Sequence, residues 1–218
     1  MQPTLEQVIN WTTEAGNIAQ NMQSKDIERH YKAQTELVTE ADTAVEAFLL
    51  KKIREEFPHH SINAEESGKL QSGSEHEWFI DPIDGTLNYS HGFPIYSVSV
   101  AYAYRGELQI GVIFSPGMRE IFWASRGDGA FLNGERIHVS TIDTLRDSLF
   151  ITGFRKHLLD TPLSNVENFV RFSRQVQTIR RLGSAALDMA YVACGRAEGF
   201  WEIALNPWDV AAGILITR

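Results

Sequence analysis

The chain has 218 residues, of which 43% are hydrophobic and 22% are charged, an ordinary globular composition that is sufficient for one substantial core. The net charge of −8 argues against nucleic acid or an anionic membrane surface as the main partner. Cys194 is the single cysteine, which excludes an internal disulfide framework and makes a reducing compartment the simplest setting. Residues 1–6 lack the basic and apolar stretches of a secretion signal, and no apolar run is long enough to span a membrane. We therefore expect a cytoplasmic protein with no nucleic-acid and no membrane partner.

The first third of the chain predicts two helices and a loop. Residues 4–22 repeat apolar side chains at helical spacing, and residues 41–57 do the same. The second helix is preceded by a capping-box sequence that runs from Thr39 to Asp42, and a proline follows its last residue. The polar, glycine-containing segment 67–76 is typical of a loop.

Strand patterns dominate the middle of the chain. A short apolar strand at 78–80 leads into a turn rich in proline, aspartate and glycine, and further strands are expected at 96–102, 108–114, 120–125 and 130–139. Several strands after two helices indicate an antiparallel sheet packed against those helices.

The last third alternates between strand and helix. Strands are expected at 148–152, 177–179 and 199–203, and helices at 162–176 and 184–193. This alternation indicates an α/β lobe. We therefore predict one α+β domain, with lobe 1 at about 1–140 and lobe 2 at about 141–218.

The residues with the most chemical character form the run Asp81-Pro82-Ile83-Asp84-Gly85-Thr86, directly after a strand. Two carboxylates three residues apart can converge on a hard cation, and the Gly-Thr pair offers backbone N–H groups to an anion. A surface Asx turn explains the same composition by local geometry alone. The residues themselves leave both interpretations open.

Two other acidic segments bear on that choice. Glu65 and Glu66 lie between a helix and a strand, and Asp209 lies at the expected start of a helix of small residues. Each has a local explanation, because paired glutamates are common on solvated surfaces and aspartate is a common N-cap. The pair His59-His60, which follows the second helix, is expected to face solvent.

These segments together resemble the inositol monophosphatase family. The matching pieces follow the order of that family and cover most of the chain: residues 37–42, 64–67, 81–89, 129–134, 183–186 and 208–213. The resemblance implies a layered αβαβα sugar-phosphatase fold and hydrolysis of an inositol monophosphate, of the myo-inositol 1-phosphate type, by direct attack of water. It also implies two or three Mg²⁺ ions, lithium sensitivity, a small phosphorylated polyol as substrate, and a homodimer.

The resemblance assigns a role to each matching position. Glu65, Asp81 and the Ile83 carbonyl would hold a first Mg²⁺, and Asp81, Asp84 and Asp209 a second, with a third, weaker ion near Glu65. Asp42 and Thr86 would orient and deprotonate the attacking water, so the catalytic group is Asp42, Glu65 and Thr86. The substrate would meet the amides of Gly85 and Thr86, the Gly183-Ser184-Ala185 segment, Asp209 and Glu202.

Alternatives stay open at this stage. Glu202 would accept hydrogen bonds from ring hydroxyls, or else form a structural pair with Arg180 or Arg181. The same chemistry could serve fructose 1,6-bisphosphate, NADP or another small phosphate ester. A function of a different class is a catalytically weak, truncated form that acts as a regulatory or binding protein.

The chain departs from the family pattern in two places. Ala64 stands where the family usually has glycine, which raises the question whether the backbone there has a negative φ. The chain also reaches Arg218 soon after the last motif, whereas family members continue with further strand and helix. Lobe 2 is therefore expected to be truncated here.

Overall fold

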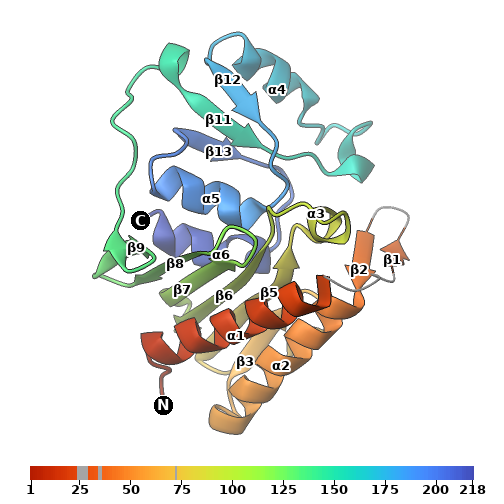
Figure 1. Ribbon diagram of the computed structural model, residues 1–218, viewed down its shortest axis with the longest axis vertical. Coiled ribbons are helices and arrows are strands. Elements are labelled where there is room, and N and C mark those ends of the chain that lie inside the picture. The colour runs from red at the N-terminus through yellow and green to blue at the C-terminus, as the bar shows by residue number, and fades with distance from the viewer. Residues whose placement is uncertain (24–28, 34–35, 72) are drawn as a thin grey trace.

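The protein folds into alternating layers of helix and sheet, as the computed structural model shows for residues 1–23, 29–33, 36–71 and 73–218 (Figure 1). From one side to the other, the layers are α1 with α2, a large sheet, α5 with α6, a small sheet, and α4. This is the αβαβα arrangement that the family resemblance implied. In the part of the chain described, no helix is long and apolar enough to cross a membrane.

The large sheet contains eight strands in the described residues, in the order β10-β9-β8-β7-β6-β5-β3-β4. Their bounds are β3 (Ser61–Ala64), β4 (Gly68–Leu70), β5 (His76–Asp84), β6 (Ser97–Tyr104), β7 (Glu107–Ser115), β8 (Glu120–Ser125), β9 (Gly129–Leu132) and β10 (Glu135–Arg136). The run from β5 to β10 is a meander of antiparallel neighbours, as expected. Asn133 and Gly134, both with positive φ, form the last turn of this meander.

Helices α1 (Leu5–Gln23) and α2 (Glu40–Glu56) cover one face of the large sheet. Thr4 and Gln7 cap α1 reciprocally, and Thr39 and Asp42 cap α2 in the same way. Gly16 lets α1 lie close to β7, since a Cβ at this position would come within 2.3 Å of the Phe114 ring. Apolar side chains from both helices and the sheet form the first core cluster.

Helices α5 (Ala185–Ala193) and α6 (Pro207–Ile216) cover the other face of the sheet. The backbone of α6 lies against β7 at Gly111, where a Cβ would come within 2.9 Å of the Ala212 carbonyl oxygen. This second core cluster joins the large sheet to the helices and to the small sheet. The two helices therefore form the middle layer of the molecule.

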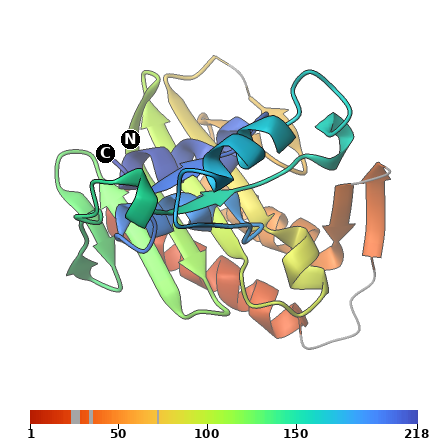
Figure 2. The same ribbon diagram turned by 90° about the horizontal axis from the view of Figure 1, so that it is seen from above.

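The small sheet consists of three parallel strands in the described residues, in the order β12-β11-β13: β11 (Leu149–Thr152), β12 (Thr178–Arg180) and β13 (Gly199–Trp201). Two short 3₁₀ turns, η1 (Leu145–Asp147) and η2 (Lys156–Leu158), flank β11. Helix α4 (Val166–Ser173) lies outermost, and α3 (Thr86–Ser90) is a short helix beside β2 (Figures 1 and 2). The division into lobes at residue 140 stays a prediction.

The structure differs from expectation at several elements. β3 pairs with β5 in parallel, so the large sheet is not wholly antiparallel, because β4 reverses the chain before β5 returns on the other side of β3. β4 itself occupies part of the expected polar loop, of which residue 72 lies outside the described residues. The helix expected at 162–176 is shorter, and an additional hairpin joins β1 (Arg29–Ala33) to β2 (Glu36–Thr39).

Candidate active site

Asp81 and Asp84 face one site because β5 carries an extra residue between them. Asp81 pairs with Ser99 and Asp84 with Ser97, so three steps along β5 match two steps along β6. In a regular strand, residues three apart point to opposite faces, and this bulge corrects the alternation. Pro82, which has no N–H to donate, lies within the bulge.

Four carboxylates meet at this strand end. Glu65 directly follows β3, and Asp209 lies in the first turn of α6. Burial raises the pKa of Asp81 well above its usual value, and the charges of Glu65, Asp84 and Asp209, with a hydrogen bond to Glu65, raise it further. Burial likewise raises the pKa of Asp84 to about 7. The structure thus brings together the four acidic side chains that the resemblance assigned to metal binding.

The donor set fits a hard divalent cation. Asp81 is 2% exposed, and its Oδ1 has no hydrogen-bond partner among the described residues. A neighbouring cation stabilises buried, mutually repelling carboxylates in their charged form, and carboxylate oxygens suit Mg²⁺. In the described residues no three His, Cys, Asp or Glu side chains are already arranged to hold a metal ion. Asp84 and Asp209 instead accept hydrogen bonds from protein donors.

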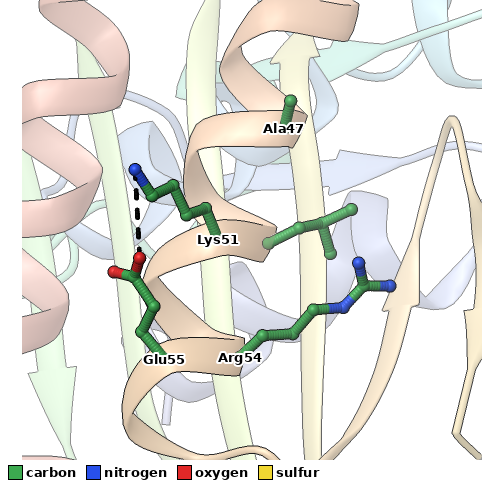
Figure 3. Close-up of a pocket in the computed structure, with 5 residues that line it drawn as sticks. Ala47, Lys51, Arg54 and Glu55 are labelled. Carbon is green, nitrogen blue, oxygen red and sulfur yellow. Dashed lines mark ion pairs between the residues drawn. The ribbon is translucent and has the colours of Figure 1, made fainter.

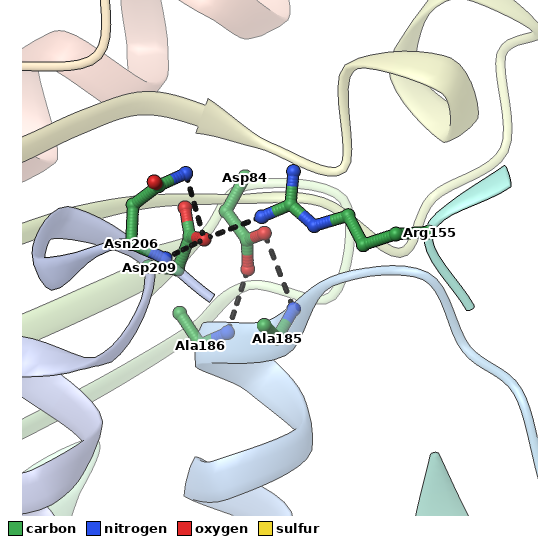
Figure 4. Close-up of polar contacts among 6 residues, drawn as sticks. All are labelled: Asp84, Arg155, Ala185, Ala186, Asn206 and Asp209. Atoms are coloured by element: carbon green, nitrogen blue, oxygen red, sulfur yellow. Dashed lines mark hydrogen bonds and ion pairs between the residues drawn. The ribbon is translucent and has the colours of Figure 1, made fainter. Parts of the chain in front are cut away.

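Asp84 is held by the start of α5. Its Oδ2 accepts a hydrogen bond from the Ser184 hydroxyl at 2.6 Å. Its Oδ2 also accepts the Ala186 N–H at 2.7 Å, and its Oδ1 accepts the Ala185 N–H at 3.2 Å (Figure 4). Two of the expected substrate residues, Ser184 and Ala185, therefore contact a predicted metal ligand. Gly183 precedes them with a φ of +87°.

Asp209 is held by donors from two elements. Its Oδ2 accepts the Asn206 N–H at 2.7 Å as part of the capping box of α6. The same oxygen lies 2.8 Å from a guanidinium nitrogen of Arg155, which comes from the loop after β11 (Figure 4). Burial raises the pKa of Asp209, while the Asn206 contact and the charge of Arg155 oppose that rise.

Asp42 and Thr86 form a hydrogen-bonded pair beside the carboxylates. The Thr86 hydroxyl lies 3.1 Å from Asp42 Oδ1 and 3.0 Å from the Ile83 carbonyl oxygen, so its one proton has two possible acceptors. Asp42 Oδ2 accepts the N–H and hydroxyl of Thr39, which fixes the carboxylate at the start of α2. Burial raises the pKa of Asp42.

Gly85 forms the link between β5 and α3. Its φ of +93° is a left-handed conformation that favours glycine, and a Cβ would come within 2.9 Å of the Gly183 carbonyl oxygen. Asn88, in α3, donates to the carbonyls of Ile95 and Leu182, both at 2.7 Å. The predicted phosphate-binding and substrate-binding segments are thereby held next to each other.

Glu202 follows β13 and is half-buried. A Cβ on Gly153 would come within 2.0 Å of its Oε2, so the carboxylate lies directly over that glycine. Burial raises the pKa of Glu202, and the charges of Arg155 and Arg181 lower it. Arg180, the other candidate partner, donates instead to the Thr178 hydroxyl and the Ile179 carbonyl.

Sequence reasoning missed three residues of this region. Asp188 is 1% exposed in α5, and its pKa is raised to about 9, first by burial and then by the charges of Asp84 and Glu202. Glu46, buried in α2, accepts the N–H groups of Glu66 and Ser67 and so shapes the turn that carries Glu65. A carboxylate within an otherwise apolar helix was the available signal for Asp188, whereas Arg155 had none.

Two further expectations concern the backbone and a histidine. Ala64 lies within β3 and is not one of the non-glycine residues with positive φ, so alanine suits its conformation.

The expectation for His60 was wrong. It is 5% exposed, stacks on Phe57 and His76, and accepts the indole N–H of Trp78 at 3.0 Å, whereas His59 is exposed.

A surface hollow of about 440 Å³ lies along the outer side of α2 (Figure 3). It is lined by Ala47, Leu50, Lys51, Arg54 and Glu55. The ion pair within it, between Lys51 and Glu55 at 3.9 Å, is solvent-exposed. None of the candidate site residues lines this hollow, so we attach no function to it.

Comparison with known proteins identifies the fold family. The model of the inositol monophosphatase family matches residues 1–218. Nus factor SuhB of Escherichia coli (strain K12) is 39% identical over 221 residues, which cover all of this chain and 83% of that protein. Inositol-1-monophosphatase of Synechocystis sp. is 44% identical over 184 residues, 84% of this chain and 64% of that protein.

Solved structures agree. The inositol monophosphatase of Anabaena (Nostoc) sp. superposes with a TM-score of 0.87 at 41% identity, covering 98% of this chain and 79% of that one. The Thermotoga maritima IMPase superposes with a TM-score of 0.88 at 37% identity, covering 97% of this chain and 81% of that one. The chain therefore belongs to the inositol monophosphatase family, a family of phosphatases.

Proposed function

We propose that this protein is a Mg²⁺-dependent phosphomonoesterase that hydrolyses an inositol monophosphate of the myo-inositol 1-phosphate type. The observation that carries the proposal is that Glu65, Asp84 and Asp209 gather beside Asp81, whose buried Oδ1 has no hydrogen-bond partner among the described residues. Without a cation, this cluster repels a phosphate dianion. With one, it becomes a binding site for that dianion.

Glu65, Asp81 and the Ile83 carbonyl would hold a first Mg²⁺, and Asp81, Asp84 and Asp209 a second. When bound, the metal supplies positive charge that attracts the phosphate, favours ionisation of water and stabilises the leaving oxygen. A third ion near Glu65, lithium inhibition at the Asp209 side and assembly as a homodimer belong to the same proposal.

Asp42 and Thr86 would move the proton of the attacking water. The Thr86 hydroxyl accepts a proton from water while it passes its own proton to Asp42 Oδ1, 3.1 Å away. The proton ends on Asp42, whose pKa is raised by burial, and the hydroxide attacks phosphorus directly. The bond between phosphorus and the polyol oxygen breaks, and the leaving oxygen takes a proton from solvent water. This route uses no covalent phosphoenzyme.

The substrate would lie between the two sheets. The N–H groups of Gly85 and Thr86 would bind phosphate oxygens, and the segment from Gly183 to Ala185 would line the polyol side. Glu202, half-buried over Gly153, would accept hydrogen bonds from ring hydroxyls. Few side chains would contact the polyol. Alternative substrates are therefore fructose 1,6-bisphosphate, NADP or another small phosphate ester.

The test is phosphate release from a panel of inositol, sugar and nucleotide phosphates, measured with Mg²⁺ and after metal removal by EDTA. We expect turnover only with Mg²⁺, and the highest kcat/KM for inositol 1-phosphate. A higher kcat/KM for another ester would reassign the substrate, and turnover without a divalent metal would contradict the proposed chemistry.

A second candidate function is that of a regulatory or binding protein. It is favoured by the name Nus factor carried by relatives that are 39% identical over the whole chain. A chain that binds Mg²⁺ in calorimetry yet releases no phosphate from any ester of the panel would favour this candidate.

A further inference from the structure

Arg155 occupies an unusual place for a cation, directly on a predicted metal ligand. Its guanidinium nitrogen lies 2.8 Å from Asp209 Oδ2, and the two side chains are 28% and 9% exposed (Figure 4). Arg155 belongs to the loop between β11 and η2, whereas Asp209 belongs to α6. The contact therefore joins the small-sheet side of the site to the carboxylate cluster.

The Asp209 oxygen that Arg155 contacts also accepts a hydrogen bond from Asn206. Asp209 Oδ2 also accepts the Asn206 N–H at 2.7 Å and approaches the Asn206 amide nitrogen at 3.5 Å. The N–H contact is part of the capping box and is fixed by the backbone of α6. Of these donors, the long Arg155 side chain is the one that can leave without disturbing a helix.

The charge balance explains what Arg155 does there. Asp81, Asp84, Glu65 and Asp209 gather like charges at one strand end, and the Arg155 guanidinium brings a positive charge to within 2.8 Å of Asp209 Oδ2. In the metal-free chain the guanidinium thus partly neutralises the side of the cluster where a second Mg²⁺ would lie. A metal ion and this guanidinium would compete for the same carboxylate oxygen.

We propose that Arg155 is an internal counter-cation that stabilises Asp209 in the metal-free protein and must release it before a second Mg²⁺ binds. Arg155 then sets the Mg²⁺ concentration that the protein requires. The inference rests on the proposed metal site, and it makes Arg155 a positioning residue for Asp209.

The test compares two variants, Arg155→Gln and Arg155→Lys, with a matched control. Arg196→Gln removes another ion pair with a carboxylate, Arg196–Glu120 at 2.6 Å, which involves none of the candidate site residues. For each protein, Tm is measured after EDTA treatment and at saturating Mg²⁺, and Mg²⁺ binding is measured by isothermal titration calorimetry.

We expect Arg155→Gln to lower the Tm of the metal-free protein and to bind the weaker Mg²⁺ about two- to tenfold more tightly, the range for a partly exposed ion pair. Its Tm deficit should shrink at saturating Mg²⁺. Arg155→Lys keeps the charge and should stay within about twofold of the wild-type Kd. Arg196→Gln should lower Tm equally with and without Mg²⁺.

Three results would overturn the inference while leaving the metal site intact. They are an unchanged or weaker Mg²⁺ affinity in Arg155→Gln, a Tm deficit that Mg²⁺ does not reduce, and an Arg155→Lys variant that tightens binding as much as Arg155→Gln. A wild-type protein that binds no Mg²⁺ in the calorimeter would overturn the proposed function as well.

Discussion

The two sides of the candidate site are built differently. On the large-sheet side, Asp42, Asp81 and Asp84 are buried and lie on a long helix and a central strand. On the small-sheet side, Arg155 and Glu202 are partly exposed and lie in loops, and no described side chain of the outer helix α4 is buried. This difference teaches that the proposed metal-binding end is fixed by the core, while the proposed substrate-contacting end can change in sequence without destabilising that core.

The sharpest test of this comparison is Asp81→Asn. Because Asp81 serves both proposed metals, we expect kcat to fall about a thousandfold or more on every substrate. The metal-free protein should become more stable, since one buried, repelled carboxylate is gone. Kinetics with a saturating substrate and Tm in EDTA measure the two effects. Loss of activity limited to one substrate would contradict the proposed role.

A matched pair of phenylalanines tests the contrast in stability. Phe122 in β8 is 0% exposed, so Phe122→Ala should reduce the free energy of unfolding by about 3–5 kcal/mol. Phe169 in α4 is 37% exposed, and Phe169→Ala should cost about 1 kcal/mol or less. Urea denaturation of both variants gives the comparison. Equal losses would show that the small-sheet side is as tightly packed as the large.

Asp188, between the two sheets, predicts a pH dependence. Its folded pKa of about 9 lies above its ordinary value of 3.8, so the folded chain keeps a proton that the unfolded chain releases. This contribution to stability is complete below about pH 4 and is lost as pH rises toward 9. Between pH 5 and pH 7 the metal-free protein should lose about 2–3 kcal/mol that Asp188→Asn does not lose. Denaturation in EDTA at the two pH values measures this difference, and parallel curves would contradict it.

The smallest effect concerns substrate reading. Glu202→Gln should lower kcat/KM for inositol phosphate about ten- to a hundredfold, because a carboxylate that accepts hydroxyl hydrogen bonds contributes roughly 1.5–3 kcal/mol. Hydrolysis of a featureless aryl phosphate should stay nearly unchanged. If Glu202 instead forms a structural pair with Arg181, both activities and Tm should fall together.

Local signals predicted much of this molecule. Helical spacing located α1 and α2, a capping box marked the start of α2, and strand patterns located β6, β7 and β8. The motif around Asp81 predicted acidic residues at a strand end. In the structure, Asp81 and Asp84 lie beside Glu65 and Asp209. Family resemblance, rather than spacing, supplied the roles of the individual side chains.

The remainder depended on contacts distant in sequence. β3 has four buried residues and no polar alternation, and its parallel partner β5 lies beyond an intervening strand. The Arg155–Asp209 pair spans 54 residues, and the burial of His60 comes from stacking on His76. No local pattern encodes such pairings, because each depends on which surfaces the folded layers bring together.

The position of α6 has a consequence for synthesis. Because a chain leaves the ribosome from its N-terminus, β5, β6 and β7 emerge well before the helix that covers their second face. During that interval the nascent chain presents an apolar sheet surface. Asp81 and Asp84 are already synthesised, whereas Asp209 is not. Chains stalled before Pro207 should therefore bind chaperones or aggregate, and the proposed second metal site, which needs Asp209, cannot form until translation has passed the start of α6.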